Sequence, residues 1–101
     1  YIVCTDAFCP TIVNAIEDAG ASDRVLMLSC DCTETYIAYA KEHAASGEYA
    51  PWYGSIDLNT ANYGYKLLDK VFAIMNGENP EAYTEHSGVM VTSANINDFY
   101  G

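Results

Sequence analysis

The chain has 101 residues, and half of them are apolar or aromatic, so its composition is that of a folded domain and not of a disordered segment. Fourteen acidic residues against four basic ones give a formal net charge of -10. This balance argues against nucleic acid and against anionic membrane surfaces as partners, because both are bound through clustered Lys and Arg. The acidity favours a well-solvated surface, since the sequence has no acidic calcium-binding loop motif.

Apolar runs and helical spacings alternate along the chain. Residues 1–5 form an apolar run of the buried-strand type, and residues 10–19 carry apolar side chains at helical spacing. Further strands are predicted at 24–30 and 52–58, with a helix at 34–45 between them. A chain that opens directly on a strand is typical of a processed or excised piece, so we expect a fragment.

The C-terminal part contains the clearest helix of the sequence, at 63–75. Its apolar stripe consists of Leu67, Leu68, Val71, Phe72 and Met75. A short strand is predicted at 88–91, and residues 93–100 are expected to form a polar tail with one helical turn. Each long helix is followed by a glycine that is expected to end it: Gly20, Gly47 and Gly77.

This order of elements predicts an α/β fold, in which βαβ units form a parallel sheet flanked by helices. Three main strands make a thin sheet. Strands this apolar require cover on both faces and neighbouring strands at both edges. We therefore expect part of the surroundings of this sheet to come from outside these residues.

Four cysteines lie at positions 4, 9, 30 and 32. Cys4 and Cys30 fall in or at the ends of apolar strands, where a cysteine usually behaves as a small hydrophobic residue. The spacings contain no C-x-x-C motif, so free thiols are the favoured interpretation, with a disulfide or a zinc site as alternatives. Cys9 stands at a predicted helix start, where it is either an activated thiol or, as we favour, a buried one.

Polar side chains are expected together at one edge of the sheet. In open parallel sheets, ligands bind beyond the carboxyl ends of the strands. Thr5 and Asp6 follow the first predicted strand, Asp31 follows the second, and Asp57 lies at the end of the third. Carboxylates at such an edge suit bidentate hydrogen bonding to neighbouring hydroxyl groups of a small polar ligand. The alternative is that Asp6 and Asp31 cap the helices that follow them.

Four segments, taken in order, carry a resemblance to a known family. Residues 1–6 read Tyr-Ile-Val-Cys-Thr-Asp before an Ala-rich helix that ends in Ala-Gly, and residues 25–31 read Val-Leu-Met-Leu-Ser-Cys-Asp. Residues 46–59 lead into a long helix that ends in Asn-Gly-Glu, and residues 91–99 read Val-Thr-Ser-Ala-Asn-Ile-Asn-Asp-Phe. Their order and spacing resemble the C-terminal part of type I periplasmic binding proteins of the ribose and galactose type, the solute-binding components of ABC sugar importers.

The resemblance implies a set of ligand-binding positions. Asp31 matches the sugar-binding aspartate that ends the Gly-Phe-Asp motif of the family, and Thr5 falls where many members have a ligand-binding Asn. Asp57 lies near the position of a family Gln, with its neighbours also open to that role. Cys30 stands where the family often has an aromatic residue that packs against the sugar ring, so the ligand site departs from the usual one.

The resemblance also implies a division into lobes. Residues 1–57 are expected to belong to the C-terminal lobe, residues 58–84 to hold a helix that packs on the N-terminal lobe, and residues 85–101 to supply the last hinge strand and a tail. Both lobes are then incomplete, so the missing N-terminal part or a domain-swapped copy is an expected partner. The other expected partner is a membrane permease, and the expected location is periplasmic or extracellular, with a lipid anchor as one option for the full-length protein.

The expected function is therefore capture of a small polar solute, in the first place a sugar, by hinge closure, without cofactor, metal or catalysis. The alternative is the effector-binding domain of a LacI-type transcription regulator, which shares the fold. An enzyme is disfavoured because His43 and His86 have no recognisable nucleophile as a partner.

Trp52 and Tyr53 are candidates for a stacking face, although a Trp within a strand also suits a core. Half a cleft is expected to bind its ligand weakly or not at all.

Overall fold

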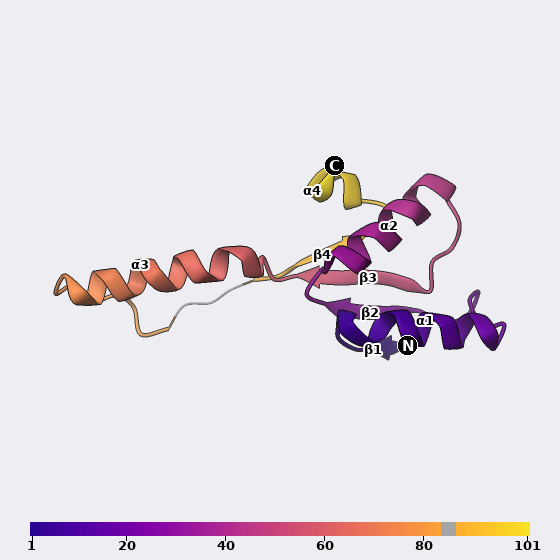
Figure 1. The fold of residues 1–101 in the computed structure, drawn as a ribbon, viewed down its shortest axis with the longest axis horizontal. Coiled ribbons are helices and arrows are strands. Elements are labelled where there is room, and N and C mark those ends of the chain that lie inside the picture. Colours follow the sequence, from indigo (N-terminus) through magenta and orange to yellow (C-terminus); the bar gives the residue numbers. More distant parts are fainter. Residues whose placement is uncertain (84–86) are drawn as a thin grey trace.

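A computed structural model describes residues 1–83 and 87–101, and it has the α/β fold that the sequence predicts. One four-stranded sheet has the strand order β1-β2-β3-β4 (Figure 1). The first three strands run parallel and the fourth runs antiparallel to the third, so the sheet is mostly parallel. The strands are β1 (Ile2–Val3), β2 (Met27–Cys30), β3 (Trp52–Asp57) and β4 (Val89–Thr92).

The helices lie where the apolar spacing predicts them, and the ends of the three long ones differ from the prediction by one residue at most. The glycine that follows each long helix has a positive φ, the left-handed conformation that ends a helix. The predicted turn in the tail is a short helix. In chain order the helical elements are η1 (Asp6–Phe8), α1 (Cys9–Asp18), α2 (Glu34–Ser46), η2 (Thr60–Asn62), α3 (Tyr63–Met75) and α4 (Ile96–Tyr100).

Strand β3 is one residue shorter than predicted, whereas β1 and β2 are each three residues shorter, and local hydrogen bonds explain these two larger differences. Arg24 lies in a turn, because its N–H donates to the carbonyl of Ala21 at 3.1 Å, so β2 begins only at Met27. At the end of β1 the carbonyl of Thr5 accepts from the N–H of Phe8 at 3.1 Å. This bond turns the chain into η1 and ends the strand early.

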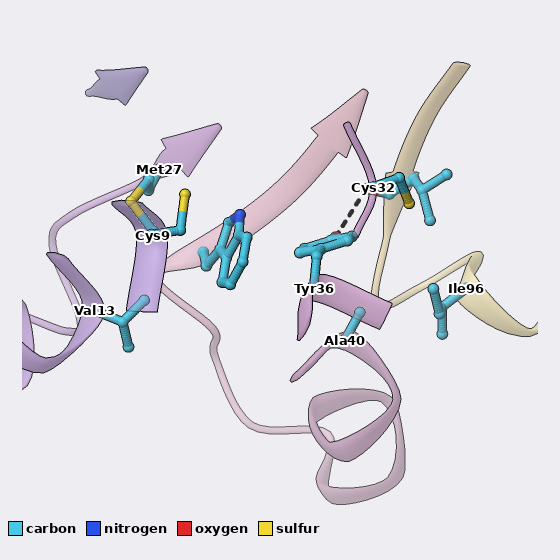
Figure 2. Packing of buried hydrophobic residues seen from close by; sticks show 9 residues of the cluster. Cys9, Val13, Met27, Cys32, Tyr36, Ala40 and Ile96 are labelled. Carbon is cyan, nitrogen blue, oxygen red and sulfur yellow. Dashed lines mark hydrogen bonds between the residues drawn. The ribbon is translucent and has the colours of Figure 1, made fainter. Parts of the chain in front are cut away.

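Three helices cover one face of the sheet. Because the strand order follows the chain order, the right-handed crossovers place α1 and α2 on the same side, and α4 packs there against α2. Figure 2 shows the side chains of these elements meeting in one layer, with Met27 next to Cys9. The buried apolar cluster consists of Cys9, Val13, Met27, Cys32, Tyr36, Ala40, Trp52, Val91 and Ile96.

The opposite face of the sheet is uncovered by the described part of the chain. The strand register places Val3 beside Leu28, and it places Cys30, Ile56 and Met90 side by side. We call these five residues the open face. Val3 is 78% exposed, and Ile56 and Met90 are also exposed. The described residues thus leave this face without cover, and the expectation that its cover comes from outside these residues stays a prediction.

Helix α3 extends away from the sheet, and the chain reaches it from β3 and returns through β4 (Figure 1). None of its 13 residues, all of which the structure describes, is buried, and Leu67 is 65% exposed. The radius of gyration is 17.5 Å, whereas a compact chain of this length has one of about 13 Å. The predicted boundary between residues 84 and 85 lies outside the described residues, so its position stays a prediction.

Candidate functional site at the carboxyl edge of the sheet

The carboxyl ends of the three parallel strands meet at one edge of the sheet, and all four predicted ligand-binding residues follow or end these strands. Thr5 and Asp6 come after β1, Asp31 directly follows β2, and Asp57 is the last residue of β3. The N–H of Asp31 donates to the carbonyl of Ile56 at 3.0 Å, which joins the turn after β2 to the end of β3. We call this region the carboxyl edge.

Asp6 lies inside the carboxyl edge and not on its surface, because it is only 1% exposed. Its Oδ1 accepts hydrogen bonds from the hydroxyls of Ser29, at 2.5 Å, and Ser55, at 2.8 Å. Its Oδ2 accepts from the N–H and the hydroxyl of Thr33, at 2.7 and 3.0 Å. Hydrogen bonds of this kind are what a buried carboxylate requires. We call these four residues the Asp6 network.

The Asp6 network corrects the expectation that Asp6 contacts a ligand. Its carboxylate is out of reach of solvent and both oxygens are occupied, so its role is structural. The alternative, that Asp6 caps a helix, holds in that its carboxylate binds the start of a helix. That helix is α2, however, and not the helix that follows Asp6 in the chain. Thr33 is the N-cap of α2, and its hydroxyl also accepts from the N–H of Tyr36 at 3.5 Å.

The hydrogen-bond partners of Asp6 were not predicted from the sequence. Ser29 and Ser55 each place a hydroxyl on the covered face of the sheet, among apolar neighbours. The register of β2 and β3 pairs them directly, so both hydroxyls reach one carboxylate. A lone serine in a buried apolar strand was the available signal, since a buried hydroxyl needs a polar partner. The pairing itself depends on the register, which a single sequence does not reveal.

The turn after β2 has an unusual backbone, in which Asp31 has a φ of 101° and Cys32 a φ of 48°. Two consecutive non-glycine residues with positive φ are strained and persist only where the surroundings hold them. Here the N–H of Cys32 donates to the Ser55 hydroxyl at 3.0 Å, and the next residue, Thr33, is bound to Asp6. The Asp6 network therefore fixes a turn from which the side chain of Asp31 is exposed.

The two other predicted residues differ in their availability. Thr5 is exposed at the start of η1. Asp57 is half-buried, and its Oδ1 accepts from the N–H of Asn59 at 2.6 Å while its Oδ2 accepts from the hydroxyl of Tyr100 at 2.5 Å. Burial, together with this hydrogen bond to Asp57, raises the pKa of Tyr100, so the phenol stays protonated and donates. Asp57 thus already joins α4 to the end of β3.

Trp52 belongs to the core and not to a stacking face. It is 2% exposed, and its indole N–H donates to the Ser29 hydroxyl at 2.7 Å, which extends the Asp6 network into the apolar layer. Its ring packs against Tyr36, with 5.0 Å between the ring centroids. Tyr53, by contrast, is exposed on β3 and remains a candidate for contact with a ligand.

The described residues offer no metal centre and no activated thiol of the kind considered from the sequence. All four cysteines are free, and among the residues described no group of three or more His, Cys, Asp or Glu side chains is arranged to hold a metal ion. His43 lies on α2 with its Nδ1 2.9 Å from the carbonyl of Tyr39, and His86 lies outside the described residues. Burial raises the pKa of three thiols, those of Cys9, Cys30 and Cys32.

Comparison with known proteins gives no family for this chain. No protein-family model and no curated protein matches it. Within residues 1–83 and 87–101, no helix is both long enough and apolar enough to cross a membrane. The geometry of the carboxyl edge is therefore the main basis for a functional proposal.

Proposed function

We propose that this chain is part of the solute-binding component of an ABC transporter and binds a sugar or a similar small polar ligand at the carboxyl edge. One observation carries the proposal, namely the exposed carboxylate of Asp31 on a strained turn that the Asp6 network holds in place. Backbone strain that is supported from inside the fold is often found where a protein contacts a ligand. The resemblance of the four sequence segments supports the same interpretation.

The chemistry of the carboxyl edge suits a polyhydroxylated ligand. A carboxylate such as that of Asp31 accepts two hydrogen bonds from neighbouring hydroxyl groups. The exposed hydroxyl of Thr5 both donates and accepts, so it adds a second, adaptable contact. Asp57 supplies one further acceptor position if a ligand hydroxyl shares the oxygen to which Tyr100 donates. We therefore assign direct contact to Thr5 and Asp31 and a shared role to Asp57.

The path of the chain supports a cleft with two sides. The adjacent antiparallel strands β3 and β4 carry the chain out to α3 and back, as a hinge between two lobes requires. Helix α3 has an exposed apolar stripe suited to the core of a second lobe. In this proposal the remaining part of the protein, or a second copy of this chain, covers α3 and closes over the ligand. The closed form then delivers the solute to a membrane permease, in the periplasm or outside the cell.

The test is an NMR titration of the 15N-labelled chain with ribose, galactose and glucose at high millimolar concentration. We expect small, saturable shifts of the amide signals of Thr5, Asp31 and Cys32 with at least one sugar, because half of a cleft still offers its hydrogen bonds. Binding should be weaker than millimolar, since enclosure by a second lobe supplies much of the affinity. The matched variants are Asp31→Ala, which should abolish the shifts, and Asp23→Ala, which removes an exposed carboxylate outside the carboxyl edge and should not.

Three outcomes contradict the proposal. Shifts that are absent for every sugar, or that persist in Asp31→Ala, remove Asp31 from the ligand site. Sub-millimolar binding by this chain contradicts the two-sided cleft, because it shows that the described surface is sufficient. The 15N spectrum of each variant also reports whether its fold is intact, so a loss of binding is separated from a loss of structure.

A further inference from the structure

The sulfur atoms of Cys4 and Cys9 lie only 3.1 Å apart. Cys4 directly follows β1, and Cys9 is the first residue of α1. The short η1 turn between them folds the chain back, and the Cys9 thiol donates to the carbonyl of Thr5 at 3.3 Å within this turn. The separation of the two sulfurs is about 1 Å longer than a disulfide bond, so a small movement of either side chain joins them.

We propose that Cys4 and Cys9 form a dithiol pair that oxidises to a disulfide, and that this disulfide locks the turn carrying Thr5 and Asp6. The inference rests on the geometry of the two thiols and is independent of the proposed function. A small-molecule disulfide is the oxidant. The Cys4 thiolate attacks one sulfur of the oxidant and releases one thiol. Cys9 then loses its proton and attacks the Cys4 sulfur, which releases the second thiol, so two protein thiols become one disulfide.

The exposure of the two residues sets the order of these steps. Cys4 is half-buried and therefore open to a small oxidant, whereas Cys9 is completely buried. Burial, and next the hydrogen bond with Cys4, raises the pKa of the Cys9 thiol. Cys9 is thus a poor first nucleophile but a well-placed second one, because the sulfur it must attack is already in contact. We expect the reaction to be faster at higher pH, as the Cys9 thiolate becomes more populated.

The other two cysteines are placed differently. Cys30 lies on the open face, on the side of the sheet opposite to the apolar layer that contains Cys9. Cys32 lies in the strained turn after β2, where burial keeps its thiol protonated. The structure therefore assigns the disulfide to the pair that spans η1 and leaves two thiols free.

The test uses the positions of the basic residues. Trypsin cleaves after Arg24 and Lys41, which places Cys4 and Cys9 together in peptide 1–24 and Cys30 and Cys32 together in peptide 25–41. The folded chain is treated with oxidised glutathione and is then unfolded in urea with N-ethylmaleimide present, so that buried thiols such as those of Cys9 and Cys32 are also blocked if they remain free. The blocked chain is then digested. We expect loss of two of the four free thiols and a peptide 1–24 that carries no N-ethylmaleimide and is lighter than the reduced peptide by two hydrogen atoms.

Matched variants make the result specific. Cys4→Ser should leave three blocked thiols, those of Cys9, Cys30 and Cys32, and no internal disulfide. Cys30→Ser, on the open face, should form the peptide 1–24 disulfide as the unmodified chain does. Since Cys9 is buried in the core, Cys4→Ser is the preferred variant, and far-UV circular dichroism confirms its fold. Four blocked thiols in the treated chain, a covalent link between the two peptides, or glutathione that stays on Cys4 would each overturn the inference.

Discussion

Helices α1 and α3 have comparable sequence patterns but very different surroundings. Both carry apolar side chains at helical spacing, and both form where that spacing predicts. Val13 of α1 is 6% exposed in the core, whereas Phe72 of α3 is 57% exposed. The apolar stripe of α3 meets nothing in the described part of the chain that buries it.

The comparison teaches that an amphipathic pattern specifies an element and a face but not the partner of that face. The stripe of α1 is buried in the apolar layer, where Val13 belongs to one cluster with Met27 of β2 and Trp52 of β3. Neither the stripe of α3 nor the open face of the sheet is covered by the described residues. An exposed apolar surface of this kind is typical of an interaction site. The body of the fold and α3 should therefore respond differently to the same kind of substitution.

The largest expected difference is between Trp52→Ala in the body and Phe72→Ala on α3. Removing Trp52 leaves a cavity beside Tyr36 and removes the indole N–H donor to Ser29, so we expect the free energy of unfolding to fall by about 3 to 5 kcal/mol. Phe72→Ala exchanges an exposed side chain for a strong helix former, so we expect a change within about 0.5 kcal/mol. Urea unfolding followed by far-UV circular dichroism measures both. Equal losses in the two variants would show that α3 is packed in solution.

The next largest effect compares two carboxylates at the carboxyl edge. Asp6→Ala deprives Ser29, Ser55 and Thr33 of their acceptor in a buried site, and we expect it to lower the free energy of unfolding by about 2 to 3 kcal/mol. Asp31→Ala removes an exposed side chain but places alanine at a positive φ, so we expect a smaller loss than for Asp6→Ala, of about 1 kcal/mol. The same urea curves decide between them. A cost for Asp31→Ala as large as that for Asp6→Ala would reverse the roles assigned to the two residues.

Much of the fold was predictable because the relevant signals are local. Helical spacing and a following glycine placed α1, α2 and α3 within one residue of their observed ends. The early end of β1 and the late start of β2 were not predictable, because turns closed by main-chain hydrogen bonds replace strand pairing there. The antiparallel direction of β4 was missed for a similar reason, since it depends on where the chain returns from α3.

The carboxyl edge was predictable as a place but not as a set of contacts. Parallel strands bring their ends together whatever their sequences, so Thr5, Asp31 and Asp57 were correctly expected at one edge. Which carboxylate is buried depends on the strand register and on the path of the turn after β2. Asp6 was misassigned because serines on neighbouring strands, far away in sequence, decide where its oxygens point.

A smaller effect on the free energy of unfolding, which depends on pH, is expected from Tyr36 on the covered face of the sheet. The Tyr36 hydroxyl donates to the carbonyl of Val91 at 2.8 Å, so Tyr36→Phe should lower the free energy of unfolding by about 1 kcal/mol at neutral pH. Burial raises the pKa of Tyr36 in the folded chain, whereas an unfolded tyrosine ionises near pH 10. The folded state therefore holds the proton more tightly than the unfolded state does.

It follows that the stabilisation from Tyr36 is fully present below about pH 10 and is lost as the pH rises toward the folded-state value. Urea midpoints measured from neutral to alkaline pH should fall more steeply in the unmodified chain than in Tyr36→Phe. The exposed Tyr1→Phe is the control and should follow the unmodified chain. Parallel curves for Tyr36→Phe and the unmodified chain would mean that Tyr36 ionises equally in both states.

The smallest effect on stability, and the sharpest on association, is expected from charge on α3. Phe72→Glu places a carboxylate within the exposed apolar stripe, so the free energy of unfolding of the monomer should change by about 0.5 kcal/mol or less. Sedimentation velocity of the unmodified chain should show concentration-dependent association, because residues 1–83 and 87–101 leave both the stripe and the open face exposed. Phe72→Glu should weaken this association, whereas Lys66→Glu, another exposed position of α3, tests whether charge alone is responsible. If Lys66→Glu weakens it equally, or if the unmodified chain stays monomeric at all concentrations, the apolar stripe is not the surface that a partner covers.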